Sequence, residues 1–190
     1  MRSDIIIRPE RPEEFAEIRQ LVQRTFAEHT PYSDGVAEAD LIEEIRASRY
    51  YQPELSFVAL LGDKMVGHFM FSQFPLSPKP TGGYDPSGKP EFLMLAPVAV
   101  HADYCRQGIG QAMLHLGVEL VKKLDYKGLT VEGNPQFYNR FGYRTSANYG
   151  IYATSGFPLN NPDCMMCQET TPGSLEGVHG YIVYDMYKNA

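Results

Sequence analysis

Two glycines near the middle of the chain, Gly108 and Gly110, have the spacing of a phosphate-binding turn. They fall between a strand-like apolar segment and an amphipathic helix, and glycine lets the backbone adopt a positive φ or approach a ligand at little steric cost. The first N–H groups of a helix have no partner within it, and the helix dipole adds partial positive charge there. These features predict an anion site, most often for a phosphate. The alternative is a tight turn without a ligand, since glycine is common in turns.

Two well-known phosphate-binding motifs do not fit this turn. A Walker-type P-loop requires Gly-Lys-Ser/Thr, and the sequence contains no such tripeptide. A dinucleotide fingerprint requires a third glycine or an alanine, and this chain has Met113 there.

A tyrosine that precedes a glycine is the second group that could do chemistry. Tyr138 is the second residue of the run F-Y-N-R-F-G-Y, which ends with Gly142 and Tyr143. A phenol can donate a proton to a leaving group, although aromatic side chains on a short helix commonly serve packing. The glycine turn one strand earlier favours the catalytic interpretation.

Together, the two motifs resemble those of the GNAT acetyltransferase superfamily. The run Cys105-Arg106-Gln107-Gly108-Ile109-Gly110 occupies the positions of the acyl-CoA signature Arg/Gln-x-x-Gly-x-Gly/Ala. Tyr138-x-x-x-Gly142-Tyr143 is similar to the family's Tyr-x-x-x-Gly-Phe, and the fuller run matches the F-Y-x-R-F-G-F of one bacterial branch. One position differs, because Cys105 stands where the family usually has Arg or Gln.

The resemblance implies a direct transfer of an acetyl group from acetyl-CoA to a primary amine of a small molecule or peptide, without a metal. Main-chain amides of the turn would hold the pyrophosphate, and the end of the central strand would hold the pantetheine arm. Tyr138 would lie near the thioester sulfur and protonate the leaving thiolate as the general acid. The implied cofactor-binding residues are Val98, Ala99, Val100, Cys105, Arg106, Gln107, Gly108, Ile109, Gly110, Gln111, Asn134 and Tyr138.

The group that takes the proton from the amine stays open, because no motif identifies it. Glu91, His101 and Glu132 are candidates by position, and an ordered water is another. Cys105 could accept the acetyl group as a nucleophile, but the sequence shows no partner base for it.

The acceptor pocket of the resembled family uses the loop between the first two helices and the C-terminal hairpin. In this chain the loop is residues 32–38, where Tyr32, Asp34 and Glu38 could hold a cation. Asn134 could contact the cofactor, or it could only cap the short helix that it precedes.

Two other functional classes are compatible with the same motifs. The chain could be a non-catalytic acyl-CoA-binding regulatory module, or it could be a nucleotide-binding domain. Replacement of Tyr138 by phenylalanine separates the first alternative from an enzyme, and binding of CoA against ATP and NAD separates the second.

The elements that position these groups follow from hydrophobic periodicity and turn residues. Ile109, Met113, Leu116, Leu120 and Leu124 predict one apolar helix stripe, and Pro97 predicts a bulge in the central strand. The other predicted elements are a strand at 5–7, helices at 12–28 and 36–48, a hairpin of 54–61 with 64–74, a surface loop at 75–90, the central strand at 91–100, a parallel strand at 128–132, a short helix opened by Asn134-Pro135, and a closing hairpin of 165–168 with 181–184.

The resemblance also implies an α/β (α+β) fold. Its mixed, mostly antiparallel sheet would have roughly six to seven strands, with a splayed central strand pair and helices on both faces. The whole of residues 1–190 is expected to form a single domain.

Composition excludes several classes of protein. The net charge of -6 argues against a nucleic-acid partner, and the longest apolar run is too short to span a bilayer. We expect a cytoplasmic protein without a signal peptide, and a homodimer is left open. Cys164 and Cys167 form a C-x-x-C pair, but no second pair of ligands accompanies them, so we expect packing rather than a metal or redox role.

Overall fold

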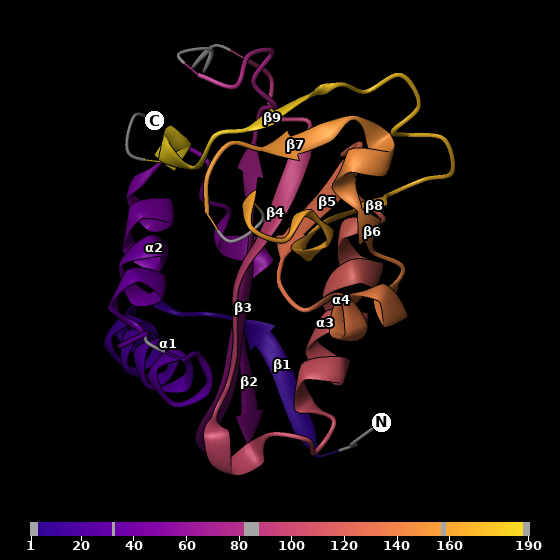
Figure 1. The fold of residues 1–190 in the computed structure, drawn as a ribbon. Coiled ribbons are helices and arrows are strands. Elements are labelled where there is room, and N and C mark those ends of the chain that lie inside the picture. Colours follow the sequence, from indigo (N-terminus) through magenta and orange to yellow (C-terminus); the bar gives the residue numbers. More distant parts are fainter. Residues whose placement is uncertain (1–3, 32, 82–87, 157–158, 188–190) are drawn as a thin grey trace. The chain divides into compact units, whose positions relative to one another are not determined.

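The computed structural model describes residues 4–31, 33–81, 88–156 and 159–187 (Figure 1). The chain divides into two compact units, one of Met1–Phe71 with Ala96–Gly117 and one of Ser72–Leu95 with Val118–Ala190. Three elements run from one unit into the other, namely β3 (Lys64–Phe74), β4 (Phe92–Val100) and α3 (Ile109–Val121). The expectation of a single domain stays a prediction.

The predicted fold class is confirmed. The other strands are β1 (Ile5–Pro9), β2 (Ser56–Leu61), β5 (Gly128–Glu132), β6 (Arg144–Thr145), β7 (Ile151–Ala153), β8 (Met165–Glu169) and β9 (Gly180–Ile182). Together with β3 and β4, these strands form a seven-stranded sheet in the order β1-β2-β3-β4-β5-β8-β6 and a two-stranded sheet of β7 and β9. The pairs β1–β2, β2–β3, β5–β8 and β6–β8 are antiparallel, and β4–β5 is parallel. The α-helices of the described residues are α1 (Phe15–His29), α2 (Val36–Ala47), α3 and α4 (Pro135–Tyr138).

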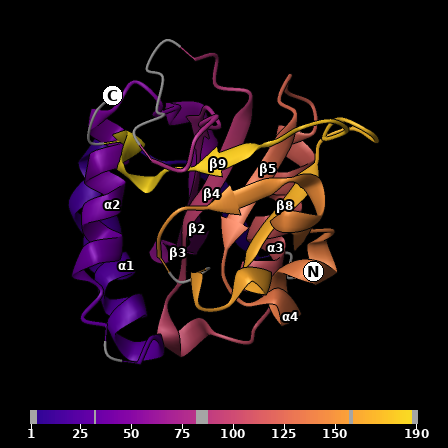
Figure 2. The same cartoon turned by 45° about the horizontal axis from the view of Figure 1, so that its top comes forward.

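In the first unit, β1 pairs along β2, and the predicted hairpin of β2 and β3 turns at Gly62, whose φ is +59°. The helices α1 and α2 lie side by side (Figures 1 and 2). Gly35 caps α2 with a φ of +73°, and a Cβ there would come within 1.9 Å of the Gln23 carbonyl oxygen. Glycine therefore allows α2 to begin directly against α1. The apolar faces of both helices are fully buried at Ile18, Val22, Ile42 and Ile45.

A buried ionic network ties β1, α2 and β3 together in this unit. Glu10 accepts two hydrogen bonds from Arg46, at 3.1 Å and 2.8 Å, and lies 3.0 Å from His68 Nε2. The Tyr51 hydroxyl donates a further hydrogen bond to Glu10 at 2.8 Å. The Glu10 carboxylate is 1% exposed, so it stays charged only because these donors replace water.

The second unit places the carboxyl end of β5 beside a short helix and the edge strands. Pairing of β4 with β5 covers Phe92 to Met94, opposite Gly128 to Thr130, although β4 continues to Val100. Strand β8 lies between β5 and β6 and buries Met166 and Cys167. The parallel strand predicted after the long helix is therefore confirmed at 128–132.

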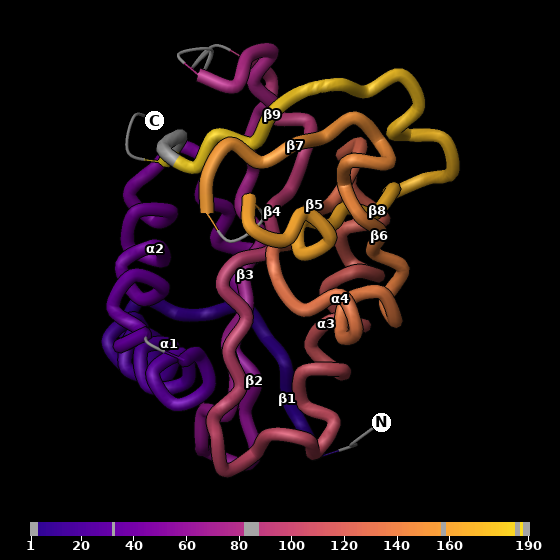
Figure 3. Tube along the Cα trace, viewed as in Figure 1, coloured from indigo at the N-terminus to yellow at the C-terminus, as the bar shows by residue number. Residues whose placement is uncertain are grey.

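The predicted closing hairpin of 165–168 with 181–184 is wrong. Strand β8 pairs with β5 and β6, whereas β9 pairs in parallel with β7, Tyr181 opposite Tyr152. Figure 3 traces β7 and β9 as neighbouring segments. Residues 184–187 form a 3-10 helix, η8 (Tyr184–Tyr187), rather than a strand. Short strand-like pieces specify that a segment is extended but not which segment it pairs with.

Helix α3 is confirmed, but its buried face differs from the predicted stripe. Leu116 is 40% exposed and Leu124, which lies beyond the helix, is 38% exposed. The buried residues are Ile109, Ala112, Met113, Leu114, Val118 and Val121. Small residues define part of this face, because Gly117 brings the helix against Phe69 and Phe71, where a Cβ would approach to 2.8 Å and 2.9 Å.

Two other sequence expectations fall near β4. Pro97 lies within the strand after a cis peptide bond, and the bulge expected there stays a prediction. The loop expected at 75–90 lies partly outside the described residues, and its described part includes a bridge from Ser77 to Tyr181.

Candidate cofactor-binding and catalytic site

The glycine turn in the first unit has a backbone suited to an anion. Arg106 and Gly108 have φ values of +59° and +84°. Within the described residues, the main-chain N–H groups of Gly108, Ile109, Gly110 and Gln111 donate no hydrogen bond. A Cβ at Gly108 would meet no atom within 4 Å, so the positive φ rather than crowding demands glycine there. The turn thus presents unpaired donors at the start of α3 beside open space.

The side chains next to this turn mostly stabilise the turn itself. Gln107 Nε2 donates to the Asp103 carbonyl at 2.9 Å. His101 Nδ1 accepts from the Asp103 N–H at 3.3 Å and caps the 3-10 helix η3 (Ala102–Tyr104). Arg106 is exposed. The expected site is therefore built from backbone donors, with Arg106 as the adjacent cation.

Cys105 has an imidazole neighbour that the sequence did not reveal. Its Sγ lies 3.6 Å from His29 Nε2 and 3.6 Å from the Val100 carbonyl oxygen. His29 Nδ1 lies 2.9 Å from the Thr25 carbonyl oxygen, a contact that holds the ring with Nε2 toward the thiol. Burial raises the pKa of the Cys105 thiol, which keeps it protonated at neutral pH. The sequence could not show this contact, because it joins residues 29 and 105.

The end of β4 leads into the turn. Ala99 is fully buried, and Val98 and Val100 are half-buried. The Val100 carbonyl accepts a hydrogen bond from the Thr25 hydroxyl at 3.5 Å as well as from Cys105. The run of predicted cofactor-binding residues at 98–100 and 105–111 is thus collected within the first unit.

The remaining predicted residues, Asn134 and Tyr138, lie in the second unit after β5. Asn134 caps α4, because its Oδ1 accepts from the Gln136 N–H at 2.9 Å. The Tyr138 ring packs on Gly133, where a Cβ would come within 2.5 Å of ring atom Cε2. Gly142 ends the following turn at a φ of +94°, and a Cβ there would lie 2.7 Å from Gln168 Nε2. Gly133 and the motif glycine Gly142 therefore each have a structural cause.

Tyr138 has the properties of a proton donor. Its side chain is 9% exposed, and its ring stacks edge-on with Phe137 and Tyr143 at centroid distances of 5.0 Å and 5.9 Å. Its hydroxyl makes no hydrogen bond within the described residues. Burial raises the pKa of the phenol well above its usual range, so it is protonated at every physiological pH.

The two candidate carboxylates of this unit have different partners. Glu132, the last residue of β5, accepts a hydrogen bond from the Tyr184 hydroxyl at 2.8 Å. Glu91 forms an ion pair with Lys127 at 2.9 Å. Sequence patterns could not find Tyr184, because its contact with Glu132 joins distant segments of the chain.

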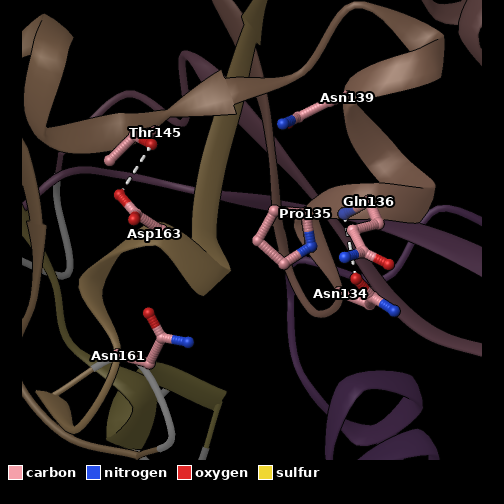
Figure 4. Close-up of a pocket in the computed structure, with 7 residues that line it drawn as sticks. All are labelled: Asn134, Pro135, Gln136, Asn139, Thr145, Asn161 and Asp163. Atoms are coloured by element: carbon pink, nitrogen blue, oxygen red, sulfur yellow. Dashed lines mark hydrogen bonds between the residues drawn. The ribbon is translucent and has the colours of Figure 1, made fainter.

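A polar pocket of about 510 Å³ opens beside α4 (Figure 4). The one charged group among its lining residues is Asp163, which accepts a hydrogen bond from the Thr145 hydroxyl at 3.1 Å. Tyr138 does not line it. The lining residues are Asn134, Pro135, Gln136, Asn139, Thr145, Asn161 and Asp163.

The expected acceptor loop is engaged in local turns where it is described. Asp34 Oδ1 accepts from the Val36 N–H at 3.0 Å, and Ser33 donates to Glu38 at 3.3 Å. Tyr32 lies outside the described residues. Among the described residues, no group of three or more His, Cys, Asp or Glu side chains could hold a metal ion, and no helix is long and apolar enough to cross a membrane.

Comparison with known proteins places these features in a family. The model of the acetyltransferase (GNAT) family matches residues 15–143. The uncharacterized N-acetyltransferase YjhQ of Escherichia coli (strain K12) is 29% identical over 143 residues, which cover 74% of this chain and 75% of YjhQ. The uncharacterized N-acetyltransferase YhbS of the same strain is 24% identical over 186 residues, which cover 97% of this chain and 99% of YhbS.

Solved structures show the same fold. The crystal structure of YhbS from Escherichia coli in complex with CoA has a TM-score of 0.78 at 23% identity and covers 98% of this chain and 93% of that one. A GNAT family acetyltransferase from Brucella melitensis in complex with acetyl-CoA has a TM-score of 0.69 at 25% identity and covers 93% and 92%. Since the family model spans more than half of the sequence, this chain belongs to the GNAT acetyltransferase family.

Proposed function

We propose that this chain is an N-acetyltransferase that moves an acetyl group from acetyl-CoA to a primary amine of a small molecule or peptide. The observation that carries the proposal is the set of unpaired main-chain donors from Gly108 to Gln111, beside open space at the start of α3. Such a group of donors with the helix dipole behind it suits a pyrophosphate.

Similarity to ligand-bound structures supports the choice of donor. The YhbS structure contains CoA, and the Brucella melitensis structure contains acetyl-CoA. The run F-Y-N-R-F-G-Y also agrees with the motif expected for one bacterial branch of the family. The net charge of -6 suits a cationic acceptor better than a nucleic acid. A cytoplasmic location and a homodimer stay predictions.

In the proposed reaction, the chain binds and orients the thioester and supplies a proton. The proposed contacts of the cofactor are the turn at 105–111 for the pyrophosphate, the backbone at 98–100 for the pantetheine arm, and Asn134. The amine attacks the thioester carbonyl directly, and Tyr138 donates its phenolic proton to the departing thiolate. Because burial keeps this phenol protonated, the acid is in the correct state throughout the neutral range.

The test combines binding with turnover. CoA should raise the melting temperature more than equal concentrations of ATP or NAD, because a ligand that binds only the folded state stabilises it. Thiol release from acetyl-CoA should then depend on one class of amine in a panel of polyamines, amino acids, amino sugars and peptide N-termini. The variant Tyr138→Phe should bind CoA normally but lose about 10²- to 10⁴-fold in turnover, as expected for an acid catalyst.

Tyr143 provides the matched control. It belongs to the same motif, it is fully buried, and within the described residues its hydroxyl has no hydrogen-bond partner. Tyr143→Phe therefore removes an unsatisfied group and should leave turnover unchanged. If wild-type protein binds CoA but acetylates no amine, the chain is a non-catalytic acyl-CoA-binding module. If ATP or NAD stabilises the fold and CoA does not, the chain is a nucleotide-binding domain.

A further inference from the structure

We infer that Glu132 is the base that takes the proton from the acceptor amine, and that Tyr184 is the residue that positions it. This inference rests on the proposed function, because it names a second catalytic group for the same reaction. Both residues that it names, Glu132 and Tyr184, belong to the second unit.

Glu132 lies at the end of β5 where the ring of the proposed acid, Tyr138, packs on the chain. Glu132 is the half-buried last residue of β5, and Gly133 follows it directly. The bare Cα of Gly133 faces the Tyr138 ring so closely that a Cβ would approach Cε2 to 2.5 Å. Glu132 and the Gly133 contact of the Tyr138 ring therefore occupy consecutive positions at the carboxyl end of β5. An acid and a base that serve one transfer reaction must lie near the same reacting group.

A hydrogen bond from Tyr184 orients the Glu132 carboxylate. The Tyr184 hydroxyl donates to Glu132 Oε2 at 2.8 Å and lies 3.5 Å from the sulfur of Met165, which is directly opposite Glu132 in the β5–β8 register. Burial, the negative charge of Glu132 and their hydrogen bond raise the pKa of the Tyr184 hydroxyl. The Tyr184 hydroxyl therefore stays protonated and donates its hydrogen bond to the carboxylate. It orients Glu132 but does not replace it as the base.

The other two candidate bases, Glu91 and His101, are less well placed. Glu91 is paired with Lys127, and the Lys127 N–H donates to the Glu91 carbonyl at 2.8 Å, just before β4 and β5 begin. Four residue steps of β5, at about 3.3 Å each, separate that amino end from Glu132 by about 13 Å. His101 accepts a main-chain N–H of its own turn through Nδ1.

The proposed step balances as follows. Glu132 removes one proton from the protonated amine, directly or through one water, and the nitrogen lone pair forms the C–N bond at the thioester carbonyl. The C–S bond then breaks, and the thiolate takes a proton from Tyr138. The nitrogen loses two protons in all, of which one leaves to solvent through Glu132 and the other balances the proton that ends on the CoA thiol.

The experiment compares Glu132→Gln with Glu91→Gln, using acetyl-CoA and the best amine from the panel. At neutral pH, Glu132→Gln should lower kcat/KM by about 10²- to 10⁴-fold. It should also move the acid limb to the higher pKa of the free amine, because only the neutral amine then attacks. Glu91→Gln removes an ion-paired carboxylate at the other end of the strand. It should change neither kcat/KM nor the pH of its acid limb. Thermal unfolding and acetyl-CoA binding verify that both variants are folded.

Tyr184→Phe supplies the readout for the positioning role. A hydrogen bond donated to a carboxylate favours its ionised form, so the acid limb of kcat/KM should move to higher pH, with a smaller loss of kcat than in Glu132→Gln. A purely structural role would lower activity equally at every pH.

The failures of the two proposals are distinguishable. A wild-type protein without CoA binding or acetyl transfer overturns the proposed function and this inference with it. An active wild type whose Glu132→Gln variant keeps its rate and its acid limb overturns this inference alone. If Glu132→Gln does not fold, an unshifted limb in Tyr184→Phe overturns the positioning role, and a full rate in Glu132→Asp, which retracts the carboxylate by one methylene, overturns the base.

Discussion

Replacement of Gly108 by alanine should weaken acetyl-CoA binding through backbone strain alone. Gly108 has a φ of +84°, and an added Cβ would meet no atom within 4 Å, so no clash contributes. Holding an L-residue in the left-handed region costs roughly 1–2 kcal/mol. If alanine relaxes the turn in the unbound protein, binding must restore the strained geometry. The dissociation constant for CoA should then rise about 5- to 30-fold.

Gly62 is the matched control for this substitution. It turns the hairpin of β2 and β3 with a φ of +59°, and a Cβ there also meets nothing within 4 Å. Gly62→Ala should therefore carry similar backbone strain, seen as a loss of stability of about 1 kcal/mol after the entropy gained by alanine is subtracted. Its affinity for CoA should stay that of the wild type. Calorimetric titration with CoA and thermal unfolding measure the two quantities. Wild-type affinity in Gly108→Ala, or equal weakening in both variants, would refute the reasoning.

Four further predictions concern stability and reactivity. Acid should destabilise the fold in two stages. Burial lowers the pKa of His68, so the unfolded chain gains a proton that the folded chain refuses as the pH falls below 6.5. The pKa of Glu10 is lowered to about 2, because the hydrogen bonds and charges of its partners outweigh burial, so its contribution is complete above 4.5 and is lost between 4.5 and 2. Melting temperatures across this range should show both stages, and a curve that is flat from pH 7 to 3 would contradict them. Gly35→Ala should unfold the protein at lower denaturant, since its Cβ would come within 1.9 Å of a carbonyl oxygen of α1; an unchanged midpoint would show that α2 can move away. Among the three cysteines, Cys105 should react first with a thiol reagent, because the other two are buried, and CoA should slow it; peptide mapping that finds another cysteine labelled first would contradict this. Replacement of His29 by Gln should slow the labelling of Cys105 relative to the wild type. An unchanged rate would show that the imidazole does not affect the thiol.

Local patterns predicted the parts of the fold that depend on neighbouring residues. The Gly62 turn, the Asn134-Pro135 helix start and the positive φ of Gly108 each follow from residues within a few positions. The two motifs also led to the family, because their glycines are required by backbone geometry or by close packing.

Long-range pairing could not be predicted in the same way. Strand β9 pairs with β7 rather than with β8, and neither composition nor alternation distinguishes these partners. The buried face of α3 was predicted incorrectly because it includes the small residues Ala112 and Gly117, which a stripe of large apolar side chains leaves out. His29 meets Cys105 across distant segments of the chain, so the contact becomes visible only once the fold brings them together.

The most direct test of the account is to observe the main-chain amides of the turn while CoA is added. Two-dimensional ¹H–¹⁵N spectra of labelled protein report each amide separately. The account predicts that the resonances of Gly108, Ile109, Gly110 and Gln111 shift strongly, because these groups gain an acceptor that they lack within the described residues. Saturating CoA that leaves these four amides unmoved would contradict it.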